Sequence, residues 1–259
     1  MSAIKTFSRK YARWFLPVSL LLALAIWQAV VWLGGSRLPA FILPPPGVVA
    51  ARFWDALTSG VLLYNTAYTL LEVLLGLLLG SGLATVTGYA LAKSVALDRL
   101  LSPYLVASQA IPIVAIAPLL VIWFGPGLFS KVLICALIVF FPVLVNTVVG
   151  LRAVPQNLRD LMGALCATPA QTLRLLEIPA ALPVLLGGLR VGATLSVIGA
   201  VVGEFVGSDR GLGFLVNVAR GQYDTAMVFV AVVTLILLAL ALYGAVVLVE
   251  RKVLQWNTN

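Results

Sequence analysis

Few residues in this chain could carry chemistry inside an apolar environment. The sequence has 9 acidic residues and no histidine, and three ionisable side chains fall within long apolar runs: Glu72, Arg190 and Glu204. A charged group at membrane depth is costly and commonly marks a functional site. Glu72 lies deeper and favours a paired or pore-facing role, whereas Glu204 stands near the end of its run, where water could reach it. Arg190 could instead reach toward lipid headgroups or cap neighbouring carbonyls.

The residue types that catalysis needs are missing. No histidine can act as a general base, and no serine or cysteine has a base partner nearby in the sequence. The chain lacks the G-x-x-x-x-G-K-[ST] phosphate loop, which excludes ATP binding by that route. Cys135 and Cys166 fall in different predicted compartments and indicate neither a disulfide nor a metal site. We therefore expect transport, anchoring or sensing, with no enzyme activity, cofactor or metal in this chain.

Composition places the chain in a membrane. Hydrophobic residues make up 62% of it and charged residues 10%, whereas soluble domains carry roughly 25% charged residues. About 20 helical residues cross the hydrocarbon core, and continuous apolar runs favour helices over barrel strands. The sequence thus predicts an all-α, polytopic membrane protein with about six transmembrane helices, at residues 15–33, 67–92, 101–124, 132–151, 184–206 and 226–249. Pro112 and Pro118 interrupt the third run, so two shorter or kinked pieces would fit equally well.

Basic residues predict the orientation of these spans. With the N-terminus in the cytoplasm, the inside segments hold Lys5, Arg9, Lys10, Arg13, Lys93, Arg99, Arg152, Arg159, Arg174, Arg251 and Lys252. The outside segments hold Arg37, Arg52, Lys131, Arg210 and Arg220. Both termini and residues 152–183 are then cytoplasmic. The net charge of +8 needs no nucleic-acid partner, because basic loops beside anionic lipid headgroups account for it. We expect residues 15–33 to stay as an uncleaved span, since they exceed a signal-peptide core.

Smaller features leave alternatives open. Gly76 and Gly80 form a G-x-x-x-G step, which suits close helix packing either within the chain or in a dimer. Gln109, beside the break at Pro112, is a candidate for the solute pathway, although proline kinks also occur in purely structural helices. Residues 43–57 predict an amphipathic helix on the outer membrane surface. Residues 207–225 predict a glycine-rich turn and a short apolar stretch, which is either a re-entrant gate element or a surface cap.

Residues 158–183, LRDLMGALCATPAQTLRLLEIPAALP, form a polar, helix-forming connection between two apolar runs. Thr168 followed by Pro169 predicts a helix start, with a hydroxyl cap and then proline at the first position. Asn157 is expected to cap a short helix that runs through Leu165. The helix from Pro169 is expected to end at Pro179, and Pro183 to open the next span. Two short helices at an angle would protrude as a docking element.

This connection resembles the EAA signature of ABC importer permeases. Aligned on IPAALP, the chain has Asp160, Leu161 and Met162 at the E-A-A positions and Cys166 where the family has glycine. The segments ILPPPGVV, QAIPIVAIAPLLVIWFGPG, FFPVLVNTVVGLRAV and DRGLGFL are similar to the nitrate/sulfonate/taurine branch of that family. The resemblance therefore covers nearly the whole chain.

The resemblance implies one transmembrane permease domain over residues 1–259, of the type I ABC importer kind. It would comprise a cytoplasmic segment 1–14, a first span and outer segment 15–65, core spans 66–250 with a coupling loop at 152–183, and a cytoplasmic tail 251–259. The residues implied to contact a cytoplasmic ABC ATPase are Arg159, Asp160, Leu161, Met162, Ala164, Cys166, Ala167 and Thr168. The candidate pathway residues are Gln109, Pro112, Glu72 and Glu204.

The same resemblance implies the partners of such a permease. An ATPase dimer would bind ATP-Mg, and closure of that dimer would switch the pathway from inward-open to outward-open. A second permease copy, as a homodimer, would enclose the pathway, and an extracytoplasmic solute-binding protein would deliver the solute. The assembly would lie in the inner or plasma membrane of a prokaryote.

Two further expectations concern Cys166 and the solute. Because a positive φ is costly for a residue with a β-carbon, we expect Cys166 in a regular helical or bridge conformation. The DLM and LCAT sequences resemble branch members linked to pyrimidine or flavin-type vitamins and precursors, and nitrate, sulfonates or taurine are the alternatives. An ATP-independent channel or secondary carrier is a rival function that the structured loop disfavours. A non-transporting scaffold is another, and the intramembrane polar groups weigh against it.

Overall fold

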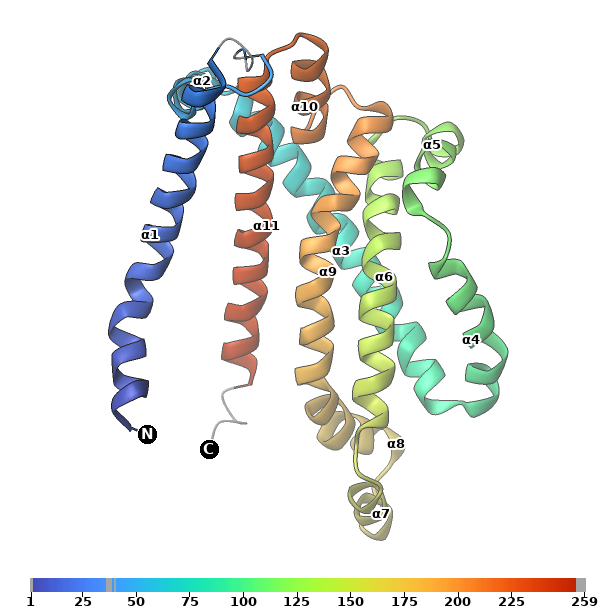
Figure 1. The fold of residues 1–259 in the computed structure, drawn as a ribbon. Coiled ribbons are helices and arrows are strands. Elements are labelled where there is room, and N and C mark those ends of the chain that lie inside the picture. Colours follow the sequence, from blue (N-terminus) through green and yellow to red (C-terminus); the bar gives the residue numbers. More distant parts are fainter. Residues whose placement is uncertain (1, 36–38, 40, 255–259) are drawn as a thin grey trace. The chain divides into compact units, whose positions relative to one another are not determined.

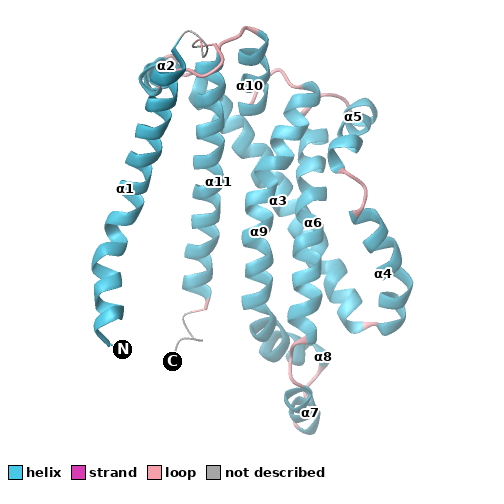
Figure 2. Ribbon diagram, viewed as in Figure 1, coloured by secondary structure: helices cyan, strands magenta, loops and turns pink. Residues whose placement is uncertain are grey.

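The computed structural model describes residues 2–35, 39 and 41–254. Within these residues every regular element is a helix, as Figure 2 shows, which confirms the predicted all-α class. Arg37, residues 255–259 of the predicted tail and the side chains of the predicted segment 1–14 lie outside the described residues. The elements are α1 (Ser2–Gly34), α2 (Pro46–Thr58), α3 (Val61–Lys93), α4 (Val95–Gln109), α5 (Ile113–Phe124), α6 (Leu128–Arg152), α7 (Gln156–Ala164), α8 (Pro169–Thr172), the π-helical turn η2 (Leu173–Glu177), α9 (Ile178–Gly207), α10 (Leu212–Gly221) and α11 (Thr225–Val253) (Figure 1).

The predicted spans are confirmed as long apolar helices. Five stretches of the described residues are long and apolar enough to cross a membrane: Pro17–Gly34, Val61–Lys93, Leu128–Arg152, Pro169–Gly207 and Thr225–Val253. The predicted third span takes the broken form that its prolines left open: it is a pair of helices, α4 and α5, bent by 95° at a short break. Pro112 causes the break, because its backbone is extended (φ −68°, ψ 116°) and it carries no N–H to continue the ladder.

The chain divides into two compact units. One contains Met1–Leu62 and Leu215–Val232, and the other contains Leu63–Phe214 and Val233–Asn259. In the first unit, Trp27 stacks on Phe229 with ring centroids 5.1 Å apart. Arg52, on the predicted amphipathic helix α2, forms a 2.8 Å ion pair with Asp224. These two contacts tie α1 and α2 to the residues that flank the start of α11.

In the second unit, α6 packs against both α3 and α9, and glycines permit the close approach. On α3, a β-carbon added to Gly76 would lie 2.2 Å from the β-carbon of Cys135, and one added to Gly80 would lie 2.5 Å from the carbonyl oxygen of Ala136. On α9, one added to Gly199 would lie 2.9 Å from the α-carbon of Cys135. The Gly76–Gly80 step is therefore used for packing within the chain.

Candidate functional site

The connection after α6 begins with α7, whose start differs from the prediction. The N-cap is Pro155 and no side chain caps the helix, because the fixed φ of proline (−59° here) already suits an entry into helix. Asn157 was expected to be the cap. Its Oδ1 does accept a 3.0 Å hydrogen bond from the N–H of Leu158, but it lies inside the first turn. That correction moves the helix start to Gln156.

One face of α7 is apolar and open. The exposed fractions are 39% for Leu158, 54% for Leu161 and 68% for Leu165, which follows the last helical residue. Spacings of three and four residues place these side chains on one side of the helix. Asp160 is also exposed, and its Oδ1 accepts a 2.9 Å hydrogen bond from Nε2 of Gln156. The short helix therefore presents apolar side chains beside a carboxylate.

Cys166 ends α7 in a left-handed conformation, which corrects the prediction of a helical or bridge conformation. Its φ is +53°. The N–H of Cys166 donates to the carbonyl of Gly163 (2.9 Å), and that of Ala167 donates to the carbonyl of Met162 (3.0 Å). This pair of bonds is the Schellman motif, which satisfies helix-end carbonyls only when the residue after the C-cap is left-handed. The hydrogen bonds therefore offset the cost of the β-carbon.

The second part of the connection confirms one prediction and corrects another. Thr168 is the N-cap of α8: its Oγ1 accepts a hydrogen bond from the N–H of Gln171 (3.3 Å), and Oε1 of Gln171 accepts one from the N–H of Thr168 (2.8 Å). The helix does not end at Pro179. It passes through the π-helical turn η2 into α9, so that Pro179 lies in the first turn of α9 and Pro183 lies inside that helix.

The remaining predicted coupling residues divide by exposure. Ala164, like Asp160 and Leu161, is exposed, whereas Met162 and Ala167 are half-buried. The predicted residue that turns inward is Arg159, which bonds to the protein rather than facing solvent. Its Nη2 donates to the carbonyl of Leu151 (2.7 Å), and its Nη1 lies 3.2 Å from Oε1 of Glu177.

Glu177 forms ion pairs with two basic side chains, one from α3 and one from α7. Its side chain is 1% exposed, and Nζ of Lys93, at the end of α3, lies 2.5 Å from the same Oε1 that Arg159 approaches. Oε2 of Glu177 is buried and has no hydrogen-bond partner among the described residues. One carboxylate oxygen thus connects α3, α7 and the π-helical turn. A buried charge is tolerated only when it is paired in this way.

The predicted pathway residue Glu204 anchors a loop near the other end of α9. Its Oε1 accepts a 2.6 Å hydrogen bond from Oγ1 of Thr69, and its Oε2 accepts one from the N–H of Gly213. Oγ1 of Thr69 also accepts a 2.8 Å bond from the N–H of Leu212. Glu204 is 1% exposed, so its carboxylate faces the protein and not solvent. These bonds hold the first residues of α10 against α3.

Glu72 and Lys131 complete this buried cluster. The exposed fraction of both residues is 0%, and Nζ of Lys131 lies 3.7 Å from Oε1 of Glu72. Nζ of Lys131 also donates to Oγ of Ser208 (2.8 Å), and Oδ1 of Asn65 accepts from the N–H of Gly211 (2.7 Å). Gly211 has φ +105°, and an added β-carbon would overlap the carboxylate of Glu204 at 2.1 Å. Only glycine fits that position.

The exposed rim of this loop carries one ion pair. Nη2 of Arg210 lies 2.7 Å from Oδ2 of Asp209, and this hydrogen bond lowers the pKa of the Asp209 carboxyl from its ordinary value. The Arg210 guanidinium also lies 5.0 Å from the ring centroid of Tyr68, a cation–π distance. The loop is therefore fixed both from beneath, by Glu204, and at its surface.

The other two pathway candidates lie at the α4–α5 break. Gln109 ends α4 and Pro112 caps α5, and both are exposed. The structure thus brings Glu72 and Glu204 into one buried cluster and leaves Gln109 and Pro112 on an open segment. Arg190, the third ionisable group within a predicted span, is paired: its Nε lies 3.1 Å from Oε2 of Glu250 on α11.

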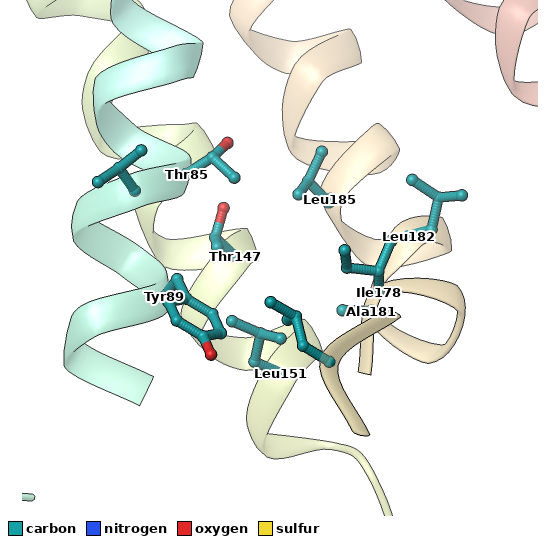
Figure 3. A pocket seen from close by; sticks show the side chains of 10 residues that line it. Thr85, Tyr89, Thr147, Leu151, Ile178, Ala181, Leu182 and Leu185 are labelled. Carbon is teal, nitrogen blue, oxygen red and sulfur yellow. The ribbon is translucent and has the colours of Figure 1, made fainter. Parts of the chain in front are cut away.

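An apolar cavity of about 280 Å³ lies where α3, α6 and α9 meet beside η2. Figure 3 shows Thr85 and Tyr89 of α3 on one side of it, facing Leu182 and Leu185 of α9 on the other. Leu173 of η2 and Ile178, at the start of α9, also line it. Residues at both ends of the π-helical turn therefore line the cavity.

Sequence reasoning missed three of the ionisable residues in these two clusters. The charge pattern assigns Lys131 to an outside segment, although its position in the first turn of an apolar helix is a signal that it needs a buried carboxylate. The same pattern uses Lys93 for orientation only. Glu177 belongs to a polar stretch of sequence, and its neighbours give no sign of burial. Lys93 and Glu177 lie 84 residues apart, beyond the reach of a local pattern.

Known proteins match the chain along most of its length. A family model described as "Binding-protein-dependent transport system inner membrane component" matches residues 80–255. The chain is 51% identical to a riboflavin transport system permease protein from Chloroflexus aurantiacus, over 94% of this chain and 90% of that protein. It is 34% identical to a formylaminopyrimidine transport permease protein from Halalkalibacterium halodurans, over 92% and 93%. It is 33% identical to a putative aliphatic sulfonates transport permease protein from Bacillus subtilis, over 91% and 85%.

Proposed function

The chain belongs to the family of binding-protein-dependent transport system inner membrane components. From this membership we propose the solute, the coupling element and an orientation with both termini and residues 152–183 in the cytoplasm. The chain is the permease subunit of an ABC importer, a multi-pass membrane protein and a transport component rather than an enzyme. The family implies an ATPase and a substrate-binding protein as partners. Membership of this family disfavours the rival function of an ATP-independent channel or secondary carrier.

The proposed solute is riboflavin or a closely related flavin. The 51% identity to the riboflavin permease over nearly both whole chains supports it. The identities of 34% and 33% to the formylaminopyrimidine and sulfonate permeases are much lower. A flat, uncharged ring system also suits a permease whose ionisable groups within the spans are held in internal pairs.

The proposed coupling element is α7 with the turn that follows it. The single observation that carries this proposal is the exposed stripe of Leu158, Leu161 and Leu165 on a nine-residue helix between two spans. Apolar side chains on one face of a short helix suit a groove in a partner protein. That partner is an ATPase dimer, which holds ATP-Mg and contacts one α7 from each of two permease copies.

The proposed solute pathway passes Gln109 and Pro112 at the α4–α5 break. Both residues are exposed in a single copy of the chain, and backbone freed at such a break is tolerated where it lines a cavity. Glu72 and Glu204 are 0% and 1% exposed. We assign them to holding the loop at Ser208–Gly211 in place, so that their effect on the solute is indirect.

Reconstitution tests the solute and the coupling element together. The permease, its ATPase and its binding protein are placed in liposomes, and ATP-dependent uptake of labelled riboflavin, formylaminopyrimidine and taurine is compared. We expect uptake of riboflavin alone. Uptake of either other solute in its place contradicts the flavin assignment.

The variant Leu161→Asp places a charge in the apolar stripe and is expected to abolish ATPase association. Its control, Val95→Asp at the first position of α4, changes a similarly exposed apolar residue (64%) outside this stripe and is expected to keep the association. Co-purification of the ATPase with Leu161→Asp at the wild-type level would exclude α7 as the docking element.

A further inference from the structure

We propose that Glu177 is the positioning residue through which movement of α7 reaches the transmembrane helices. The inference rests on the proposed function of α7 as the coupling element. It assigns a specific role to one buried carboxylate, namely to keep α3, α7 and the start of α9 connected while the coupling element shifts. The ion pairs of Glu177 with Lys93 and Arg159 transmit that movement.

The geometry of the carboxylate carries the first step. Oε1 of Glu177 lies 2.5 Å from Nζ of Lys93 and 3.2 Å from Nη1 of Arg159. The same guanidinium also bonds to the carbonyl of Leu151 at 2.7 Å, near the end of α6. Four segments therefore meet at one buried group, and a displacement of Arg159 on α7 pulls on all of them. Charge-assisted hydrogen bonds are stronger than neutral ones, which suits a connection that must persist while the helices move.

The second oxygen of Glu177 permits movement without loss of the connection. Oε2 is buried and accepts no hydrogen bond among the described residues, so each cation can transfer from one oxygen of the carboxylate to the other. The position inside a π-helical turn agrees with this role, since such turns occur frequently at functional sites.

The apolar cavity provides the space that the movement needs. Leu173 and Ile178, on the two sides of Glu177, both line the cavity of about 280 Å³. Tyr89, whose ring lies 5.8 Å beneath Nζ of Lys93, lines it as well. Protein interiors are close-packed, so a side chain can shift without displacing its neighbours only toward a void of this kind. The turn and the end of α3 can therefore move into the cavity together.

The first experiment measures riboflavin transported per ATP hydrolysed in the reconstituted importer. Glu177→Gln keeps the shape of the side chain and removes its charge. We expect the ATPase to remain bound and the ratio to fall about tenfold, a size within the range of known coupling free energies. The matched control is Asp98→Asn, which breaks a more exposed ion pair with Arg152 (2.8 Å) between α4 and α6. Its ratio is expected to stay within twofold of wild type.

Arg159 provides a conservative rescue that a merely structural role would not require. Arg159→Met is expected to reproduce the loss, and Arg159→Lys to restore most of the transport ratio while ATPase association stays constant. If Glu177→Gln fails to fold, Leu185→Phe replaces it. That change fills part of the cavity, is expected to keep the protein folded, and should lower the ratio by restricting movement. A wild-type ratio in Glu177→Gln, or in Leu185→Phe when Glu177→Gln is unfolded, overturns the proposal.

A second measurement does not depend on the solute. Thr85→Cys places a thiol in the cavity, in a Cys166→Gly background where the remaining Cys135 is buried. We expect a non-hydrolysable ATP analogue, bound to the attached ATPase, to change the rate of thiol labelling, and Glu177→Gln to abolish that change. An unchanged rate in the parent overturns the proposal. Failure of the ATPase to bind the wild-type permease instead refutes the proposed function, so the two failures are distinguishable.

Discussion

The strain at Cys166 predicts that a glycine there makes the coupling turn more stable. A residue with a β-carbon costs about 1–2 kcal/mol in the left-handed region, and the φ of Cys166 is +53°. Glycine removes that cost but gains about 0.5–1 kcal/mol of backbone freedom in the unfolded chain. The thiol is exposed, so its loss removes no core packing. Cys166→Gly is therefore expected to stabilise the end of α7 by about 0.5–1 kcal/mol.

Hydrogen exchange measures this change locally, where a global melting curve would dilute it. The reporters are the amides of Cys166 and Ala167, which bond to the carbonyls of Gly163 and Met162. Because a tenfold change corresponds to about 1.4 kcal/mol, exchange should slow about two- to fivefold.

Two controls separate backbone strain from other effects. Cys166→Ala removes the thiol and keeps the β-carbon, so it should leave exchange unchanged. Ala164→Gly, at a regular helical position of the same helix, should speed exchange, since glycine inside a helix costs about 1 kcal/mol. Faster exchange in Cys166→Gly, or equal slowing in Cys166→Ala, would refute the strain argument.

Three other predictions follow from the packing, the buried cluster and the orientation. Gly80→Ala should destabilise the protein by about 1–3 kcal/mol, because its β-carbon would lie 2.5 Å from the Ala136 carbonyl. Gly82→Ala is the control and should be neutral, because an added β-carbon there would have no atom within 4 Å. The fraction of protein that stays folded after heating should be lower for Gly80→Ala than for Gly82→Ala, and equal fractions would contradict this prediction. Thr69→Val leaves Oε1 of Glu204 and the N–H of Leu212 each without its hydrogen bond to Thr69 and should destabilise the protein by about 2–5 kcal/mol. Proteolysis of the 208–213 loop should then be faster than in wild type. Thr87→Val removes only a bond within its own helix and serves as the control. The exposed Cys166 should react with a membrane-impermeant maleimide in inside-out but not in right-side-out vesicles, and the reverse result would invert the proposed orientation.

The cluster around Glu177 and the cluster around Glu204 differ in how much movement their contacts allow. At the α7 end, the carboxylate of Glu177 has an unused oxygen and a neighbouring void. In the Thr69–Glu204 cluster, both carboxylate oxygens of Glu204 accept hydrogen bonds, and the glycine at 211 leaves no free space beside them. The first arrangement suits movement, and the second suits a fixed loop. Glu177 and Glu204 thus differ in how many of their carboxylate oxygens accept hydrogen bonds among the described residues.

Much of the local structure could be predicted because its causes lie within a few residues. The Thr168 cap depends on Pro169 and Gln171, and the break in the third span depends on Pro112 alone. The conformation of Cys166 was wrong because the β-carbon penalty was weighed without the Schellman bonds that offset it. The end at Pro179 was wrong because the π-helical turn carries the helix through the proline.

By itself the sequence determined the apolar class, the helical class, the five long apolar helices and the family resemblance. Each follows from composition, from the hydropathy of about 20 consecutive residues or from local sequence motifs. Only the tertiary structure decided which carboxylate meets which cation. Thr69 and Glu204 are 135 residues apart, and Lys93 and Glu177 are 84 apart. Such pairs form only when the helices pack against one another. Hydropathy therefore predicts whether each charged residue lies in a span or a loop, but it does not predict which residue it pairs with. The loop between α6 and α9 could be predicted to be a docking element from its residues, and the fold connected it to α3.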